Sequence, residues 1–70
     1  MEYKKLEIKE NFIRLDSAMK LASVVVTGGH AKMVIQDGLV TVNDEVCLMR
    51  GKKLFKGDKF FFENKGFIIV

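Results

Sequence analysis

The first helical pattern in the chain follows a residue suited to begin a helix. Asp16 is a candidate N-cap, and the residues after it predict a short helix over positions 17–23. The apolar residues at helical spacing that would face the core are Leu15, Met19 and Ala22. Because two turns of helix are not stable alone in water, we expect this helix to depend on packing against the rest of the domain.

A second helical pattern follows a β-branched stretch and a pair of glycines. Ala31, Val34 and Ile35 stand at positions i, i+3 and i+4, which predicts a helix over positions 30–37 with these side chains in the core. Gly38 comes directly afterwards, as glycine often does where a helix ends in the left-handed conformation.

Strand patterns lie on both sides of the two helices. Residues 3–9 alternate charged and apolar side chains, which predicts an edge strand. Residues 39–42 and 45–48 predict a hairpin around Asn43 and Asp44, since both of these residue types tolerate positive φ. Cross-strand partners share a face of a sheet, so this register pairs residue 42 with 45 and residue 40 with 47.

The C-terminal part of the chain predicts a second hairpin. Its strands would be residues 59–63 and 67–70, joined around residues 64–66. In such a strand Phe60 and Phe62 share one face and Phe61 takes the other. We expect at least two of the three rings to be buried in the core. The alternative is that the rings form an exposed stacking platform for bases.

The order of these elements predicts the fold class. One strand, two helices and four strands in 70 residues predict a single small α+β domain over residues 1–70. Its two short helices would pack on one side of an antiparallel sheet of about four to five strands.

The positive charge of the chain is concentrated in one segment. The net charge is +3, but residues 50–59 hold five basic residues and one acidic residue, a net +4, and the remainder carries −1. Within this segment Leu54 and Phe55 are the expected apolar anchors. The segment is either a solvated lysine-rich loop or an electrostatic footprint for phosphates.

The residues give no positive sign of catalysis. One His and one Cys, His30 and Cys47, cannot form a disulfide or close a zinc site, and neither a phosphate-binding loop motif nor a dinucleotide motif occurs. We therefore expect no enzyme activity, no metal and no cofactor. The first residues lack the apolar core of a signal peptide, and no apolar run approaches membrane-spanning length, so we expect a cytoplasmic protein without membrane contact.

Four motifs in order resemble the S4 RNA-binding domain. They are Leu15-Asp16 at a helix start, Thr27-Gly28-Gly29-His30-Ala31-Lys32, the stretch from Ile35 to Asn43 with Asp37-Gly38 inside it, and Arg50-Gly51-Lys52-Lys53-Leu54 followed by Gly57-Asp58. The resemblance covers residues 13–58, with the strand at 3–9 and the hairpin at 59–70 added on either side. The chain is most similar to small stand-alone bacterial S4-domain proteins.

The resemblance implies that the two-helix αL motif and the loop beyond the first hairpin bind RNA. Carried over by position, the implied contact residues are Arg14, Lys20, Gly28, Gly29, His30, Lys32, Gln36, Arg50, Lys52 and Lys53. For the two glycines, direct contact with RNA and turn geometry alone are both open. The implied partner is ribosomal or transfer RNA, with a ribosomal particle as its setting, and the chain is expected to be a monomer.

The alternative function is a protein-interaction or adaptor module associated with the ribosome or with replication. Proteins that the chain resembles often carry polar or basic residues just before the shared Arg50, whereas this chain has Cys47, Leu48 and Met49 there. Exposed apolar residues at Leu48, Met49 and Phe61 would suit a protein partner.

Overall fold

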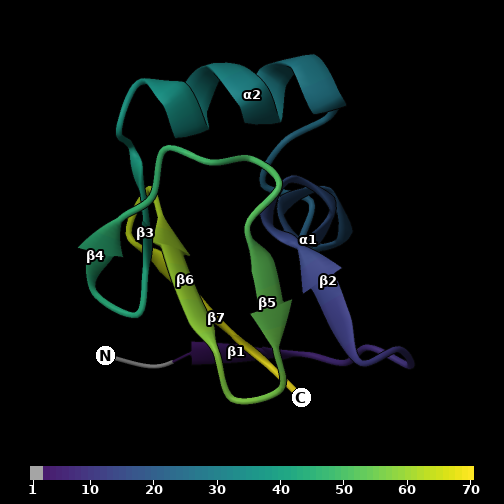
Figure 1. Ribbon diagram of the computed structural model, residues 1–70. Coiled ribbons are helices and arrows are strands. Elements are labelled where there is room, and N and C mark those ends of the chain that lie inside the picture. Colours follow the sequence, from purple (N-terminus) through teal and green to yellow (C-terminus); the bar gives the residue numbers. More distant parts are fainter. Residues whose placement is uncertain (1–2) are drawn as a thin grey trace.

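The computed structural model describes residues 3–70 and places two helices and seven strands in one small α+β fold (Figure 1). Residues 1 and 2, which the predicted domain includes, lie outside the described part. The elements in chain order are β1 (Tyr3–Leu6), β2 (Phe12–Arg14), α1 (Leu15–Leu21), α2 (Gly28–Gln36), β3 (Val40–Val42), β4 (Glu45–Val46), β5 (Lys53–Phe55), β6 (Lys59–Phe62) and β7 (Lys65–Ile69).

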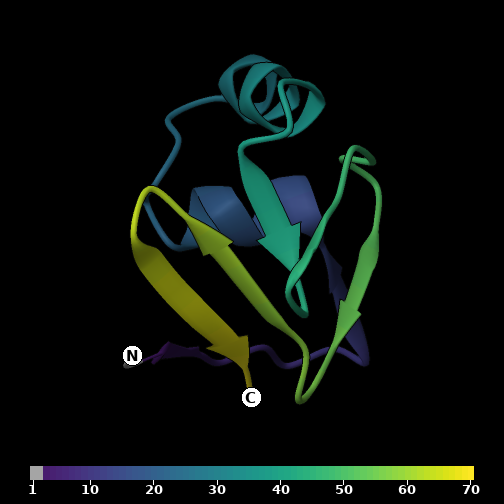
Figure 2. The ribbon, with the colours of Figure 1, turned by 90° about the vertical axis from the view of Figure 1, so that its left-hand side faces the viewer.

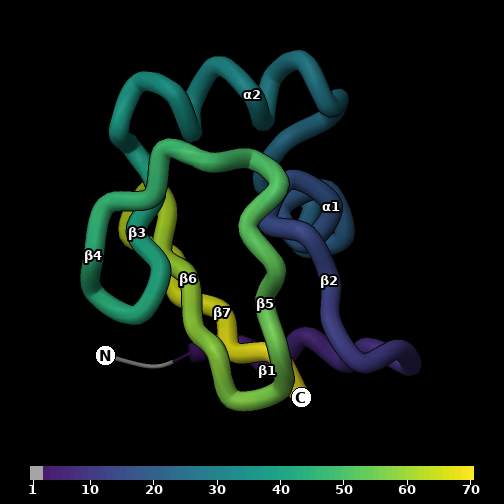
Figure 3. Tube along the Cα trace, in the orientation of Figure 1, coloured from purple at the N-terminus to yellow at the C-terminus, as the bar shows by residue number. Residues whose placement is uncertain are grey.

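Five of these strands form one sheet in the order β1-β7-β6-β3-β4, and β2 and β5 form a separate antiparallel ribbon. The tube view in Figure 3 shows the ribbon standing beside the sheet, with α2 above both and α1 at the upper end of β2. The α+β class with two helices is confirmed. The expectation of a fully antiparallel sheet is wrong at one edge, because β1 pairs with β7 in parallel.

Helix α1 begins earlier than the sequence predicts. It starts at Leu15, so Asp16 lies inside its first turn and is not the N-cap; Arg14 is, and its side chain makes no capping hydrogen bond. The first amides of the helix are bound instead by distant backbone. Leu15 N donates to Lys52 O at 2.8 Å and Asp16 N donates to Arg50 O at 3.1 Å. A cap supplied by another segment leaves no local sequence signal.

Helix α2 also begins two residues before its predicted start. Thr27 is its N-cap, and the Thr27 hydroxyl oxygen accepts from His30 N at 3.1 Å. The two glycines are therefore the first turn of the helix, not a break before it. At the other end Gly38 has φ of +76°, as the sequence predicted.

Both tight hairpins use two-residue turns of positive φ. Asn43 and Asp44 have φ of 50° and 71°, and the predicted pairing of Val42 with Glu45 is confirmed. Strand β4 is shorter than predicted and ends at Val46. The second turn lies one position earlier than expected, at Glu63 and Asn64, with φ of 52° and 62°.

The core lies between the helices and the sheet, and in Figure 2 α2 lies above the strands and α1 behind them. Phe60 and Phe62 are buried and Phe61 is only partly so, which confirms that at least two of the three rings are core. The Phe60 and Phe67 rings stack at 5.0 Å between centroids. The buried apolar residues are Leu6, Ile8, Leu15, Ala18, Met19, Val25, Ala31, Val34, Ile35, Val40, Val42, Leu54, Phe60, Phe62, Phe67 and Ile69.

The β2–β5 ribbon was not predicted. Phe12 pairs with Phe55, Ile13 with Leu54, and Arg14 with Lys53. Leu54 is fully buried, which confirms it as an anchor, whereas Phe55 is 49% exposed and is not one. No helix within residues 3–70 is both long and apolar enough to cross a bilayer.

Candidate nucleic-acid interface

The basic loop, residues 47–52, is held in place by the start of α1. The hydrogen bonds from Leu15 N and Asp16 N to the Lys52 and Arg50 carbonyls join the loop to the helix. A third bond, from Lys52 N to Met49 O at 3.2 Å, closes a turn inside the loop. Backbone hydrogen bonds from the carbonyls to the helix fix the position of the loop. Its basic side chains are therefore not needed to anchor the loop. Arg50, Lys52 and Lys53 are all exposed.

Arg14 joins this cationic group from β2. It pairs with Lys53 across the ribbon, and its guanidinium lies against Gly51, where an added Cβ would stand 3.6 Å from Nη2. Arg14 Nη2 is 3.4 Å from Asp16 Oδ2, with the Arg14 side chain 53% exposed. An exposed ion pair contributes about 0–1 kcal/mol, so Asp16 holds Arg14 weakly and a phosphate can compete for it.

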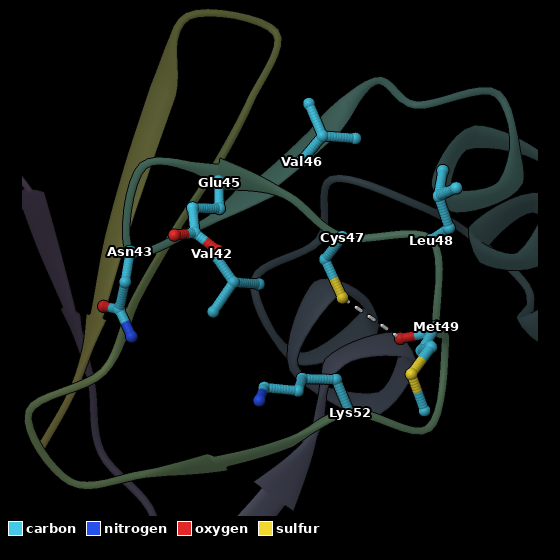
Figure 4. A pocket seen from close by; sticks show the side chains of 8 residues that line it. All are labelled: Val42, Asn43, Glu45, Val46, Cys47, Leu48, Met49 and Lys52. Carbon is cyan, nitrogen blue, oxygen red and sulfur yellow. Dashed lines mark hydrogen bonds between the residues drawn. The ribbon is translucent and has the colours of Figure 1, made fainter.

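A shallow hollow of about 380 Å³ lies beside the loop, and Figure 4 shows it from close by. Lys52 extends across the hollow below Cys47, and Val46 and Leu48 also line it, with their side chains directed upward in this view. The Cys47 thiol lies 3.5 Å from the Met49 carbonyl oxygen, to which it donates. Leu48 and Met49 are 58% and 68% exposed, so the loop presents apolar as well as basic side chains.

Helix α2 supplies a second, separate group of candidate residues. Ala31, Val34 and Ile35 are buried, which leaves Lys32 and Gln36 together on the exposed face, one turn apart. Gly29 precedes Lys32 on the same side of the helix. His30 is exposed as well, but it lies about 200° around the helix from Lys32 and therefore faces elsewhere.

Neither Gly28 nor Gly29 is required by the backbone conformation. In residues 3–70 only Gly38 and Gly57 have positive φ among the glycines. A Cβ at Gly28 would meet nothing within 4 Å, and one at Gly29 would meet only the Thr27 hydroxyl oxygen at 3.8 Å. Since Thr27 takes the amide of His30, the amides of Gly28 and Gly29 are the ones at this helix end that an outside acceptor can reach.

The structure brings some candidates together and leaves others apart. Arg14, Arg50, Lys52 and Lys53 gather at the start of α1. The basic loop also passes the end of α2, where Gly38 lies close to the side chains of Val46 and Leu48, and Figure 1 shows the loop running below α2 toward α1. Lys20 is exposed in the last turn of α1, about 9 Å along the helix from Arg14, so it is not part of the same cluster.

Within the described residues, no group of three or more His, Cys, Asp or Glu side chains is placed to hold a metal ion. Cys47 is partly buried against the core, while His30 is exposed at the start of α2. The site is therefore a set of cations and exposed amides on two helices and a loop, an arrangement suited to binding anionic groups.

The fold and this arrangement agree with the comparison of the sequence with protein families. The model of the S4 domain matches residues 6–70, so the chain belongs to the S4 domain family. This confirms the resemblance drawn from the four sequence motifs, and the match extends beyond the 13–58 region that carries them. The chain is also 39% identical over 61 residues to a protein of Bacillus subtilis (strain 168) named "Probable ribosome maturation protein RlbA"; the alignment covers 87% of this chain and 86% of that protein.

Proposed function

We propose that this chain binds structured RNA, ribosomal or transfer RNA, without catalysing a reaction, and that it does so as a monomer in the cytoplasm. Membership of the S4 domain family and the name of the Bacillus relative support an RNA-related and ribosome-related role. The observation that carries the proposal is the capping of α1 by the carbonyls of Arg50 and Lys52. It fixes the backbone of Arg50 and Lys52 next to the paired Arg14 and Lys53 before any ligand arrives.

The two groups of residues would act in different ways. Arg14, Arg50, Lys52 and Lys53 supply charge to phosphates, and the start of α2 supplies backbone amides where glycine lets the RNA backbone come close. Lys32 and Gln36 would extend the surface along α2, whereas Lys20 and His30 lie outside it. Recognition would depend on shape and phosphate position, because A-form grooves display little readable sequence.

The test compares two double variants that remove the same charge. Lys52→Ala with Lys53→Ala removes two cations from the proposed surface; Lys4→Ala with Lys5→Ala removes two exposed cations from β1, at the opposite end of the molecule in Figures 1 and 2. With about four phosphate contacts, the slope of log affinity against log salt is expected near −3, about a 100-fold loss between 50 and 200 mM salt. The Lys52/Lys53 variant should reduce that slope by about 1.5, while the β1 variant leaves it close to that of the unmodified chain.

Fluorescence anisotropy with labelled transfer RNA and ribosomal RNA hairpins measures these slopes. Absence of binding at low salt, or equal losses in the two double variants, would contradict the proposal.

Exposed apolar side chains favour a second candidate, a protein-interaction role. Val46, Leu48 and Met49 are each more than half exposed and lie next to one another on the basic loop and the strand before it. Leu48→Asp with Met49→Asp would abolish a protein contact there. Phe61, the third residue expected on such a surface, is only partly exposed and lies in β6.

A further inference from the structure

The outer face of the β2–β5 ribbon carries two aromatic rings and two cations. Side chains alternate along the ribbon, so Ile13 and Leu54 turn toward the core. The opposite face then presents the pairs Phe12–Phe55 and Arg14–Lys53. Phe12 is 38% and Phe55 49% exposed, whereas Phe60, Phe62 and Phe67 are all buried.

The two exposed rings form a pair that other side chains leave partly open. Their centroids are 5.8 Å apart with the planes inclined at 50°, so the ring faces are not closed against each other. Lys53 Nζ stands 4.9 Å from the centre of the Phe12 ring. Phe55, the more exposed of the two, is thus the ring available to a flat ligand, and the Lys53 ammonium already lies over the neighbouring Phe12 ring.

The surrounding charges favour a polyanion over a protein as the ligand. Arg14 and Lys53 share this face, and the basic loop leads directly into β5. The nearby carboxylate of Asp58 is engaged within its own turn: it accepts from Phe55 N at 2.8 Å and from the Asn43 side-chain amide at 3.2 Å. Protein interfaces are depleted in lysine at their centre, whereas sites for single-stranded nucleic acid combine aromatic rings with a cationic path for the backbone.

We propose that this ribbon face is a stacking platform for an unpaired base of RNA. Phe55 stacks on the base, Phe12 supports it from the side, and Arg14 and Lys53 bind the adjacent phosphates. The inference rests on the proposed RNA binding and adds one property to it: the preferred RNA has a single-stranded or looped nucleotide next to the part that meets the basic loop and α2.

A tryptophan reporter tests the platform directly. The chain has no tryptophan and one tyrosine, so Phe55→Trp places a single selectively excited fluorophore on the proposed face. A short single-stranded oligouridylate should quench it by stacking. An RNA duplex of the same length and heparin, a polyanion without bases, should bind the cations without comparable quenching.

Affinity measurements give the second readout. Phe55→Ala should weaken binding of the single-stranded RNA about 5- to 150-fold, the range for loss of one stacked base, and should leave the salt slope unchanged because no phosphate contact is lost. Phe55→Leu keeps an apolar side chain and should lose nearly as much, which separates stacking from general hydrophobic contact. Val70→Ala, at an exposed apolar residue outside the basic loop, α2 and the ribbon, is the control and should leave the affinity unchanged.

The outcomes separate this inference from the proposed function. If single-stranded RNA binds equally to the unmodified chain, Phe55→Ala and Phe55→Leu, and the tryptophan is not quenched, the platform is refuted. Binding of hairpin RNA that still needs Lys52 and Lys53 would leave the proposed function intact. If no RNA binds at all, both fail.

If the variants release a protein partner and leave RNA affinity unchanged, the face is a protein contact and the platform is refuted. Thermal unfolding by circular dichroism checks that each variant is folded.

Discussion

Replacing both Gly28 and Gly29 by alanine is expected to stabilise the fold and to weaken RNA binding. Both lie in the first turn of α2 without positive φ, so alanine can adopt the same backbone conformation. The added methyl groups meet nothing within 4 Å at Gly28 and only the Thr27 hydroxyl oxygen, at 3.8 Å, at Gly29. Alanine at a compatible position gains about 0.4–1 kcal/mol because it restricts the unfolded chain, so the double variant should gain about 1–2 kcal/mol.

Thermal and urea unfolding followed by circular dichroism measure this gain. For a domain of this size, 1 kcal/mol raises Tm by about 4–8 °C. Gly38→Ala is the matched control: it is the same substitution at the other end of the helix, but φ there is +76°. A residue with a Cβ in that conformation costs about 1–2 kcal/mol, so the control should lower Tm by a similar amount.

Anisotropy with RNA hairpins supplies the other half of the test. If the RNA backbone approaches the start of α2, two methyl groups on its path should lower the affinity while the fold gains stability. A double variant that unfolds more easily than the unmodified chain would refute the steric reasoning. A stabilised variant with unchanged RNA affinity would refute close approach of RNA to these glycines. RNA binding would then give no reason for glycine in place of alanine at either position.

Two further predictions concern the core and the sheet. Leu54→Ala should lower the free energy of unfolding by about 2–5 kcal/mol in urea titration, because Leu54 is fully buried and anchors the ribbon to the core; a loss below 1 kcal/mol would show that the ribbon folds back over the space. Gly66→Ala should cost about 1–3 kcal/mol, since its Cβ would stand 2.7 Å from the Tyr3 ring. That cost should shrink in a Tyr3→Ser background, and an equal cost in both backgrounds would place the strain elsewhere.

Local chemistry made several features predictable from sequence. Asn43-Asp44 between two apolar stretches fixed both the turn and the register of its hairpin, because few residues accept positive φ. Gly38 likewise located the end of α2. The spacing of Ala31, Val34 and Ile35 identified the buried side of that helix, and so the exposed positions of Lys32 and Gln36.

Features that depend on distant partners were not predictable in the same way. The start of α1 depends on carbonyls of Arg50 and Lys52, so Asp16 was wrongly taken as the cap. The β2–β5 ribbon joins segments about forty residues apart, each only three residues long. Phe55 was therefore expected in the core, although it pairs with Phe12 on the outer, exposed face of the ribbon. The alternation of Phe12, Ile13 and Arg14 was the available signal, but it is too short to identify a strand alone.

The parallel pairing of β1 with β7 has a consequence for how the chain folds. Tyr3 lies opposite Gly66, so the first and last strands of the sheet meet across almost the whole described sequence. Contacts between residues so far apart in the sequence form late, because the chain between them must close into a loop first. Such contacts therefore reduce the rate of folding. During synthesis, β1 would leave the ribosome long before β7, the strand that it pairs with, exists. While β1 is still unpaired, the charged residues Lys4 and Lys5 protect it from aggregation, because charge on an unpaired strand discourages pairing with other chains.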